Sequence, residues 1–235
     1  MKETIYTIPV NEAFEQTSKC PMCFLEERLE AEAVEYALGP AMMEPDHREM
    51  SNEKGYCNKH FEMMYRQPNK LPLALVLDTH LEHIRKMLEQ TEPKPQKKGL
   101  FKAKEKTEKS SLQPIIDSCM ICEKIEHTMT RYCDVLLLMW KKDDEFKAKF
   151  EASNGFCLPH FEKLYKLCDS DDFARALLKK ERRVLEDLQQ DIHRFTLKFD
   201  YRNKDMEWGN AKDAPIRTVE KLAEKYGVQE AIVAP

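Results

Sequence analysis

The sequence reads Cys20-Pro-Met-Cys23 and then, after a gap of 33 residues, Cys57-Asn-Lys-His60. The same order returns as Cys119-Met-Ile-Cys122 and, after a gap of 34 residues, Cys157-Leu-Pro-His160. In both copies a Gly and an aromatic residue precede the second pair, and Phe-Glu follows it. Agreement in both order and spacing indicates an internal duplication with an offset of 99 to 100 residues.

Helical patterns surround these motifs in both copies. Residues 24–38 are rich in Ala, Leu and Glu, carry apolar residues at three- and four-residue spacing, and end at Gly39-Pro40. Longer helices are predicted over 73–90 and 172–198, and short helices after each C-x-x-H pair. A short extended segment over residues 5–10 is the one exception. We therefore predict an all-α protein in which the duplicated helical unit forms a pseudo-symmetric helical bundle.

The chain divides into four parts on this basis. Residues 1–91 form the first helical repeat with its metal site, and residues 112–199 form the second. Between them lies a Lys-rich segment, 92–111, which contains seven Lys and two Pro and is predicted to be a flexible linker. Residues 200–235 are predicted to form a C-terminal strap and helix. Because neither repeat alone carries a complete set of core residues, we expect one compact domain.

The motifs themselves predict metal binding. A C-x-x-C pair and a C-x-x-H pair together supply four ligands of the kind that tetrahedral structural zinc sites use. One Cys3His site is expected within each repeat, at helix N-termini where the helix dipole stabilises thiolates. The predicted ligands are Cys20, Cys23, Cys57 and His60 in the first repeat, and Cys119, Cys122, Cys157 and His160 in the second.

The expected cofactor is Zn2+, two ions per chain, because this assignment uses all eight residues. An iron–sulfur cluster is an alternative, although such clusters usually have four Cys ligands. Metal-free thiol redox chemistry at the C-x-x-C pairs is another, but it leaves both C-x-x-H pairs without a role.

Composition excludes several other classes of function. The 38 basic and 42 acidic residues give a net charge of −4, so nucleic acid is not an expected partner. The longest apolar run, 135–140, is far too short to span a membrane, and the N-terminus lacks the features of a secretory signal. We expect a cytoplasmic protein with reduced thiols.

No sequence pattern indicates an enzyme. The chain has no Gly-rich phosphate loop, no dinucleotide fingerprint and no nucleophile elbow, so no catalytic residue is predicted. Cys133 is expected to be a buried, inert thiol. The pair His80 and His83 is expected to be solvated or to cap a helix rather than to form a further metal site. The polar and aromatic segment 201–208 is either a structural strap or a binding element.

The duplicated C-x-x-C with G-[YF]-C-x-x-H, together with the segment 201–208, resembles an uncharacterised bacterial family, a domain of unknown function with twin C-P-x-C elements. The resemblance covers most of the chain, although Met120 stands in the second copy where proline is expected. It supports the fold and the metal sites and implies no activity. The sequence thus predicts a zinc-binding helical protein with structural metal sites, an adaptor or regulatory protein that binds an unknown protein partner. The alternative is a thiol-redox, iron–sulfur or metal-handling protein.

Overall fold

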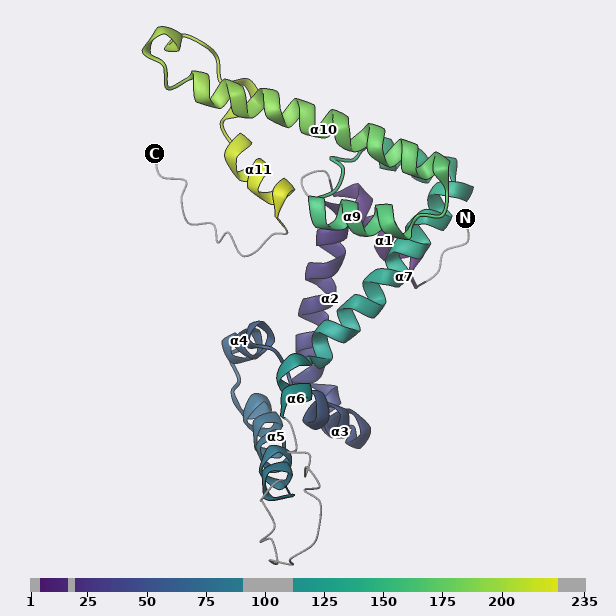
Figure 1. Cartoon of the computed structure of the whole chain (residues 1–235), viewed down its shortest axis with the longest axis vertical. Coiled ribbons are helices and arrows are strands. Elements are labelled where there is room, and N and C mark those ends of the chain that lie inside the picture. Colours follow the sequence, from purple (N-terminus) through teal and green to yellow (C-terminus); the bar gives the residue numbers. More distant parts are fainter. Residues whose placement is uncertain (1–4, 17–19, 91–111, 224–235) are drawn as a thin grey trace, which may run out of the picture. The chain divides into compact units, whose positions relative to one another are not determined.

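A computed structural model describes residues 5–16, 20–90 and 112–223 of the chain (Figure 1). Within these ranges every regular element is helical, which confirms the all-α prediction. The α-helices are α1 (Thr7–Glu15), α2 (Pro21–Ala37), α3 (Pro45–Lys54), α4 (Asn58–Arg66), α5 (Leu71–Gln90), α6 (Gln113–Asp117), α7 (Met120–Lys142), α8 (Asp144–Ala152), α9 (Leu158–Leu167), α10 (Asp171–Leu197) and α11 (Ala214–Leu222). Three short 3-10 helices are η1 (Pro40–Met43), η2 (Tyr201–Asn203) and η3 (Gly209–Ala211).

The helices follow the same order around the motifs of both copies. In each copy a long helix begins at the C-x-x-C pair, a shorter one follows, a third begins at the C-x-x-H pair, and another long helix ends the series. The helices of this series are α2 to α5 in the first copy and α7 to α10 in the second. The predicted helices over 24–38, 73–90 and 172–198 are therefore present, each with slightly different ends.

The extended segment predicted over residues 5–10 is wrong, because α1 begins at Thr7. Val10, Ala13 and Phe14 are buried at three- and four-residue spacing along this helix. The Phe14 ring packs against the rings of Phe146 and Phe156, with centroids 4.8 and 6.1 Å away. Tertiary packing of one apolar face thus overrides the weak extended preference of the Ile and Val residues.

The chain forms two compact units, and each contains residues from both repeats. Residues 1–28 and 128–235 make up the first unit, and residues 29–127 the second. The boundaries fall inside α2 and α7 rather than in the predicted linker. The linker, 92–111, lies outside the described residues, as does the chain beyond Ala223.

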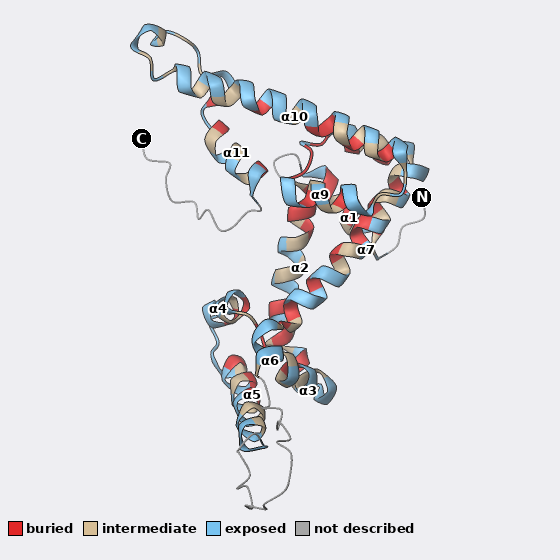
Figure 2. Ribbon diagram, in the orientation of Figure 1, coloured by how far each residue is buried: buried red, intermediate tan, exposed pale blue. Residues whose placement is uncertain are grey.

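An aromatic core fills the first unit. Phe146, Phe150, Phe156 and Phe173 are fully buried there, and the Trp140 ring meets Phe173 edge-on at 5.2 Å. Figure 2 shows buried positions in red along α10, separated by exposed ones. Large rings in edge-to-face contact bury much apolar area and hold a fixed geometry. This core fixes the starts of α8, α9 and α10, and the C-x-x-H pair lies at the start of α9.

The segment 201–208 acts as a strap at the end of α10. The Lys198 ammonium donates hydrogen bonds to the carbonyl oxygens of Lys204 and Met206, and the Trp208 ring lies 5.7 Å from the Phe195 ring. Arg194 donates a hydrogen bond to the carbonyl oxygen of Glu207 at 3.3 Å. These contacts reverse the chain, so that α11 packs back against α10.

In the second unit α5 packs against α3, and the buried residues of α5 are Leu73, Val76 and His80. None of the helices in the described parts of the chain combines the length and the apolar character that a membrane crossing requires.

Candidate metal centres

The eight predicted ligands form two groups of four, but each group takes one pair from each repeat. Donor atoms within a group all lie within 4.8 Å of one another. Site 1 consists of Cys20, Cys23, Cys157 and His160, and site 2 consists of Cys57, His60, Cys119 and Cys122. The prediction that each repeat holds its own site is therefore wrong: the C-x-x-C pair of one copy meets the C-x-x-H pair of the other.

Helix lengths explain why each C-x-x-C pair meets the C-x-x-H pair of the other copy. The first C-x-x-C pair lies at the start of α2, whose 17 residues carry the chain about 25 Å away. The next helix, α3, has ten residues and spans only about 15 Å, so it cannot return the chain to its starting point. The second copy has the same geometry, since α7 has 23 residues and α8 has nine.

Site 1 lies entirely within the first unit. The Sγ atoms of Cys23 and Cys157 are 3.5 Å apart. The Nδ1 atom of His160 lies 3.7 Å from the Cys20 Sγ atom, 3.4 Å from Cys23 Sγ and 3.1 Å from Cys157 Sγ. Cys23, Cys157 and His160 are buried, and Cys20 is half-buried. A cavity of about 210 Å³ adjoins the site and is lined in part by Cys20 and Cys157.

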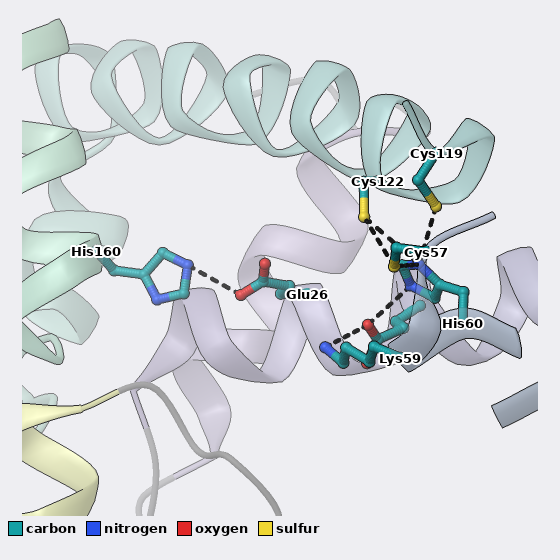
Figure 3. Close-up of polar contacts among 8 residues, drawn as sticks. Glu26, Cys57, Lys59, His60, Cys119, Cys122 and His160 are labelled. Carbon is teal, nitrogen blue, oxygen red and sulfur yellow. Dashed lines mark hydrogen bonds and ion pairs between the residues drawn. The ribbon is translucent and has the colours of Figure 1, made fainter. Parts of the chain in front are cut away.

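Site 2 lies entirely within the second unit, and Figure 3 shows its four side chains. Here the Cys57 and Cys122 Sγ atoms are 3.8 Å apart. The Nδ1 atom of His60 lies 3.2 Å from Cys57 Sγ, 3.2 Å from Cys119 Sγ and 3.4 Å from Cys122 Sγ. Cys119 and His60 are buried, Cys57 is half-buried and Cys122 is exposed.

These separations fit a single tetrahedral ion. With Zn–S near 2.3 Å and Zn–N near 2.0 Å, tetrahedral geometry places ligand sulfurs about 3.8 Å apart and sulfur and nitrogen about 3.5 Å apart. The observed S–S distances of 3.5 and 3.8 Å agree with this, as do S–N distances of 3.1 to 3.7 Å.

Each site joins the N-terminal ends of two helices, as predicted. Cys57 and Cys157 are the N-cap residues of α4 and α9, while α2 and α7 begin directly after Cys20 and Cys119. Free backbone N–H groups and the positive end of the helix dipole favour thiolates at these positions.

A carboxylate on α2 contacts the outer nitrogen of each histidine. Glu26 Oε2 lies 3.3 Å from His160 Nε2, and Glu30 Oε1 lies 3.0 Å from His60 Nε2 (Figure 3). Lys59 also pairs with Glu30, at 2.5 Å. A carboxylate that accepts the Nε2 proton leaves Nδ1 free to bind a metal and fixes the ring orientation. Both histidines thus present Nδ1 to the thiols.

The sequence did not reveal these two glutamates, because the duplication does not repeat them. The positions 99 residues further on are Ile125 and Met129, which are buried apolar residues of α7. The available signal was helical spacing: Glu26 and Glu30 follow Cys23 by three and seven residues on one face of α2.

The protons of site 2 are redistributed among its ligands. Burial raises the pKa of the Cys119 thiol, but its hydrogen bonds with His60, Cys122 and Cys57 together outweigh burial and lower that pKa to about 6. Burial lowers the pKa of His60, but hydrogen bonds with Cys119 and Glu30 raise it to about 10. Burial and the neighbouring thiols Cys119 and Cys57 raise the pKa of Cys122 to about 12. Burial and like charge disfavour three thiolates in this volume, and a bound cation would favour them.

Site 1 shows the same pattern. Burial opposes ionisation of Cys20, but hydrogen bonds from Cys157, Cys23 and His160 hold the pKa of its thiol well below the usual range. Hydrogen bonds with Cys157 and Cys20, and burial, raise the pKa of Cys23 far above it. Burial lowers the pKa of His160, and hydrogen bonds with Cys157 and Cys20 raise it to about 12.

The glycine before each C-x-x-H pair is required by its backbone. Gly55 and Gly155 have φ values of 63° and 71°, a left-handed conformation that favours glycine. A Cβ atom at Gly55 would lie 3.1 Å from the His80 ring, and one at Gly155 would lie 2.8 Å from the Glu181 carboxylate. Both turns therefore pack closely against the long helix that follows, α5 or α10.

The groups that support these two turns differ in charge. His80 is buried rather than solvated as predicted, and its Nδ1 atom lies 3.1 Å from the carbonyl oxygen of Asn52. At the other turn Glu181 accepts a hydrogen bond from the backbone N–H of Phe156 at 3.2 Å and forms a buried ion pair with Lys221 of α11. Breaking a buried pair of this kind leaves an uncompensated charge, at a typical cost of about 3–5 kcal/mol.

Met120 has a role that proline could not fill. Its backbone N–H donates a hydrogen bond to the carbonyl oxygen of Gly55 at 3.1 Å, which ties the start of α7 to the turn before Cys57. Proline lacks this N–H. The departure from the C-P-x-C pattern in the second copy thus has a structural reason.

Replacing Glu30 with Gln is expected to weaken metal binding at site 2 by about 10- to 100-fold, because the amide keeps the shape but not the charge that orients His60. Zinc competition titrations with a chromogenic chelator would measure this. Glu35→Gln, an exposed change on the same helix, is the control and should leave both affinities unchanged. Equal affinities in the two variants would contradict the assigned role of Glu30.

The remaining thiols lie outside both groups. Cys133 is fully buried in α7, in agreement with the expectation of an inert thiol, and Cys168 is half-buried after α9. Neither belongs to a group of metal-type donors in the described part of the chain.

Neither the curated proteins nor the solved structures contain a match to the chain. A family model does match it, over residues 1–229, and that range includes all eight ligands and the strap. The chain therefore belongs to the family of unknown function DUF6062.

Proposed function

We propose that this protein binds two zinc ions per chain and that both ions are structural. The convergence of four protein donors on each site carries the proposal, since their separations match the tetrahedral geometry of zinc. Catalytic zinc sites keep one position for water or substrate, whereas each site here already has four protein ligands. A structural ion would join the starts of α2 and α9 at site 1, and of α4 and α7 at site 2.

Zinc is the ion that the donors favour. Three thiolates and one imidazole suit a borderline-soft ion without a geometric preference of its own. Iron–sulfur clusters mostly use four Cys ligands, and both groups here include a histidine with its own carboxylate partner. Redox chemistry at the C-x-x-C pairs alone would give these histidines no role, whereas zinc binding uses them as ligands.

The cellular role that we propose is that of a non-catalytic adaptor or regulator that binds a protein partner. Large apolar side chains exposed on α5 support this role, because such surfaces mark sites of protein contact. They are Leu71, Leu75, Leu81 and Leu88.

Metal analysis of protein purified without added metal tests the proposal. We expect two zinc ions per chain by inductively coupled plasma mass spectrometry. Metal-free protein, or iron with acid-labile sulfide and a visible absorption band, would refute it and favour the thiol-redox or iron–sulfur alternative.

A further inference from the structure

We propose that site 2 is also an oxidation site, at which hydrogen peroxide converts Cys57 and Cys122 to a disulfide and the ion is lost, while site 1 keeps its ion. This inference rests on the proposed zinc sites and assigns a regulatory modification to one of them. It follows from the exposure of the close thiol pair, which differs between two sites with the same ligand set.

Exposure is the first difference. Cys122 is exposed and Cys57 is half-buried, so the pair that spans α4 and α7 faces solvent. The other two ligands of site 2 are shielded, since Cys119 is 5% exposed and His60 is 1% exposed. An oxidant arriving from water therefore meets Cys122 first, because thiol oxidation follows access as well as thiolate character.

The short distance between the exposed Cys122 and its neighbour Cys57 is the second observation. The Sγ atoms of Cys57 and Cys122 are 3.8 Å apart, and a disulfide needs about 2.05 Å, so a closure of less than 2 Å joins them. Both residues lie at helix starts, with Cys57 at the N-cap of α4 and Cys122 in the first turn of α7. The two accessible thiols of site 2 are thus direct neighbours.

In site 1 the two thiols that lie close together are not exposed to solvent. Its thiols Cys23 and Cys157 are 3.5 Å apart, but they are only 7% and 1% exposed. Its more accessible thiol, Cys20, is half-buried beside the small cavity. Phe156, which directly precedes Cys157, is also fully buried. The close thiol pair of site 1 is therefore shielded from an oxidant in solution.

The proposed reaction balances with hydrogen peroxide as the oxidant. The Cys122 thiolate attacks one peroxide oxygen, the O–O bond breaks, and hydroxide leaves, which gives a sulfenic acid on Cys122. The Cys57 thiolate then attacks that sulfur, the S–O bond breaks, and a second hydroxide leaves. Two protons from water or buffer convert both hydroxides to water. The two sulfurs lose two electrons and the peroxide gains them, and only Cys119 and His60 remain as ligands.

Peroxide treatment of the zinc-loaded full chain tests this inference. The Cys168→Ser variant is the protein to use, because it removes the half-buried thiol that lies outside both sites. Released zinc is followed with a chromogenic chelator, and the oxidised cysteines are mapped by alkylation and peptide mass spectrometry. We expect one of the two ions to leave, a Cys57–Cys122 cross-link, and oxidation of site 2 at least about tenfold faster than that of site 1. A thiol reductant with added zinc should restore the second ion.

A second variant checks the role of Cys122 directly. Cys122→His keeps a fourth zinc ligand but removes the thiol that meets the oxidant, so it should retain both ions under the same treatment. Equal rates at the two sites, a Cys119–Cys122 cross-link, or retention of both ions by the Cys168→Ser protein would overturn the inference. Protein that contains no zinc before peroxide is added would instead refute the proposed function, so the two failures are distinguishable.

Discussion

Chelation of both ions should lower the midpoint of thermal unfolding by about 10–20 °C or more. Structural zinc sites in small domains contribute about 10–16 kcal/mol of binding free energy, which is linked directly to folding. Loss of even about 5 kcal/mol shifts the midpoint of a chain of this size by about 10–20 °C. The ligands also oppose one another without a cation, since three thiols and one imidazole lie within 4.8 Å in each site.

Circular dichroism at 222 nm during heating would measure this effect. Protein stripped with a strong chelator under reducing conditions is compared with the same protein after zinc is restored, and after magnesium is added instead. Zinc should restore the original midpoint, whereas magnesium, which prefers oxygen ligands, should not. An unchanged midpoint in the stripped protein would contradict a structural role for the metal.

Much of the fold could be predicted from the sequence because its helices are long and amphipathic. Regular apolar spacing and the Gly39-Pro40 stop made α2 predictable, and the same holds for α10, which buries Phe173, Leu177 and Leu188 on one face. Helix α1 was not predictable from its own residues. Its helical state depends on contacts of Phe14 with rings more than 130 residues away.

The ligands were predictable, but the way in which they combine was not. Spacing shows that a C-x-x-C or C-x-x-H pair can present two donors together, because those donors lie one helical turn apart. It does not show which pairs meet, since that depends on the direction and length of the helices between them. A duplicated motif adds to the ambiguity, because pairing within a copy and pairing between copies use the same residue types.

The residues that support the metal sites could not be predicted from the sequence either. Glu26 and Glu30 have no counterpart in the second copy, and the turns at Gly55 and Gly155 rest on a histidine in one case and a Glu181–Lys221 ion pair in the other. The two motif copies share the donors and the glycines but not the groups around them. Only the three-dimensional contacts identify those groups.

Pairing between the repeats leads to the second prediction with a large effect. Cys23→Ala with Cys157→Ala removes two ligands from site 1 and leaves site 2 complete, so this variant should still bind one zinc ion tightly. Cys23→Ala with Cys57→Ala removes one ligand from each site and should leave no complete site. Loss of a directly bound thiolate should weaken zinc binding by more than the roughly 100-fold that loss of a ligand's hydrogen-bond partner causes. Each variant lacks two thiols, so the pair is matched in composition.

The zinc content of these two variants after passage over a chelating resin is the most direct test of the exchanged pairing. Pairing between the repeats predicts one ion per chain for Cys23→Ala/Cys157→Ala and none for Cys23→Ala/Cys57→Ala. Pairing within each repeat predicts the reverse, because the second variant would then keep Cys119, Cys122, Cys157 and His160 together. One ion in the second variant and none in the first would contradict the structure described above.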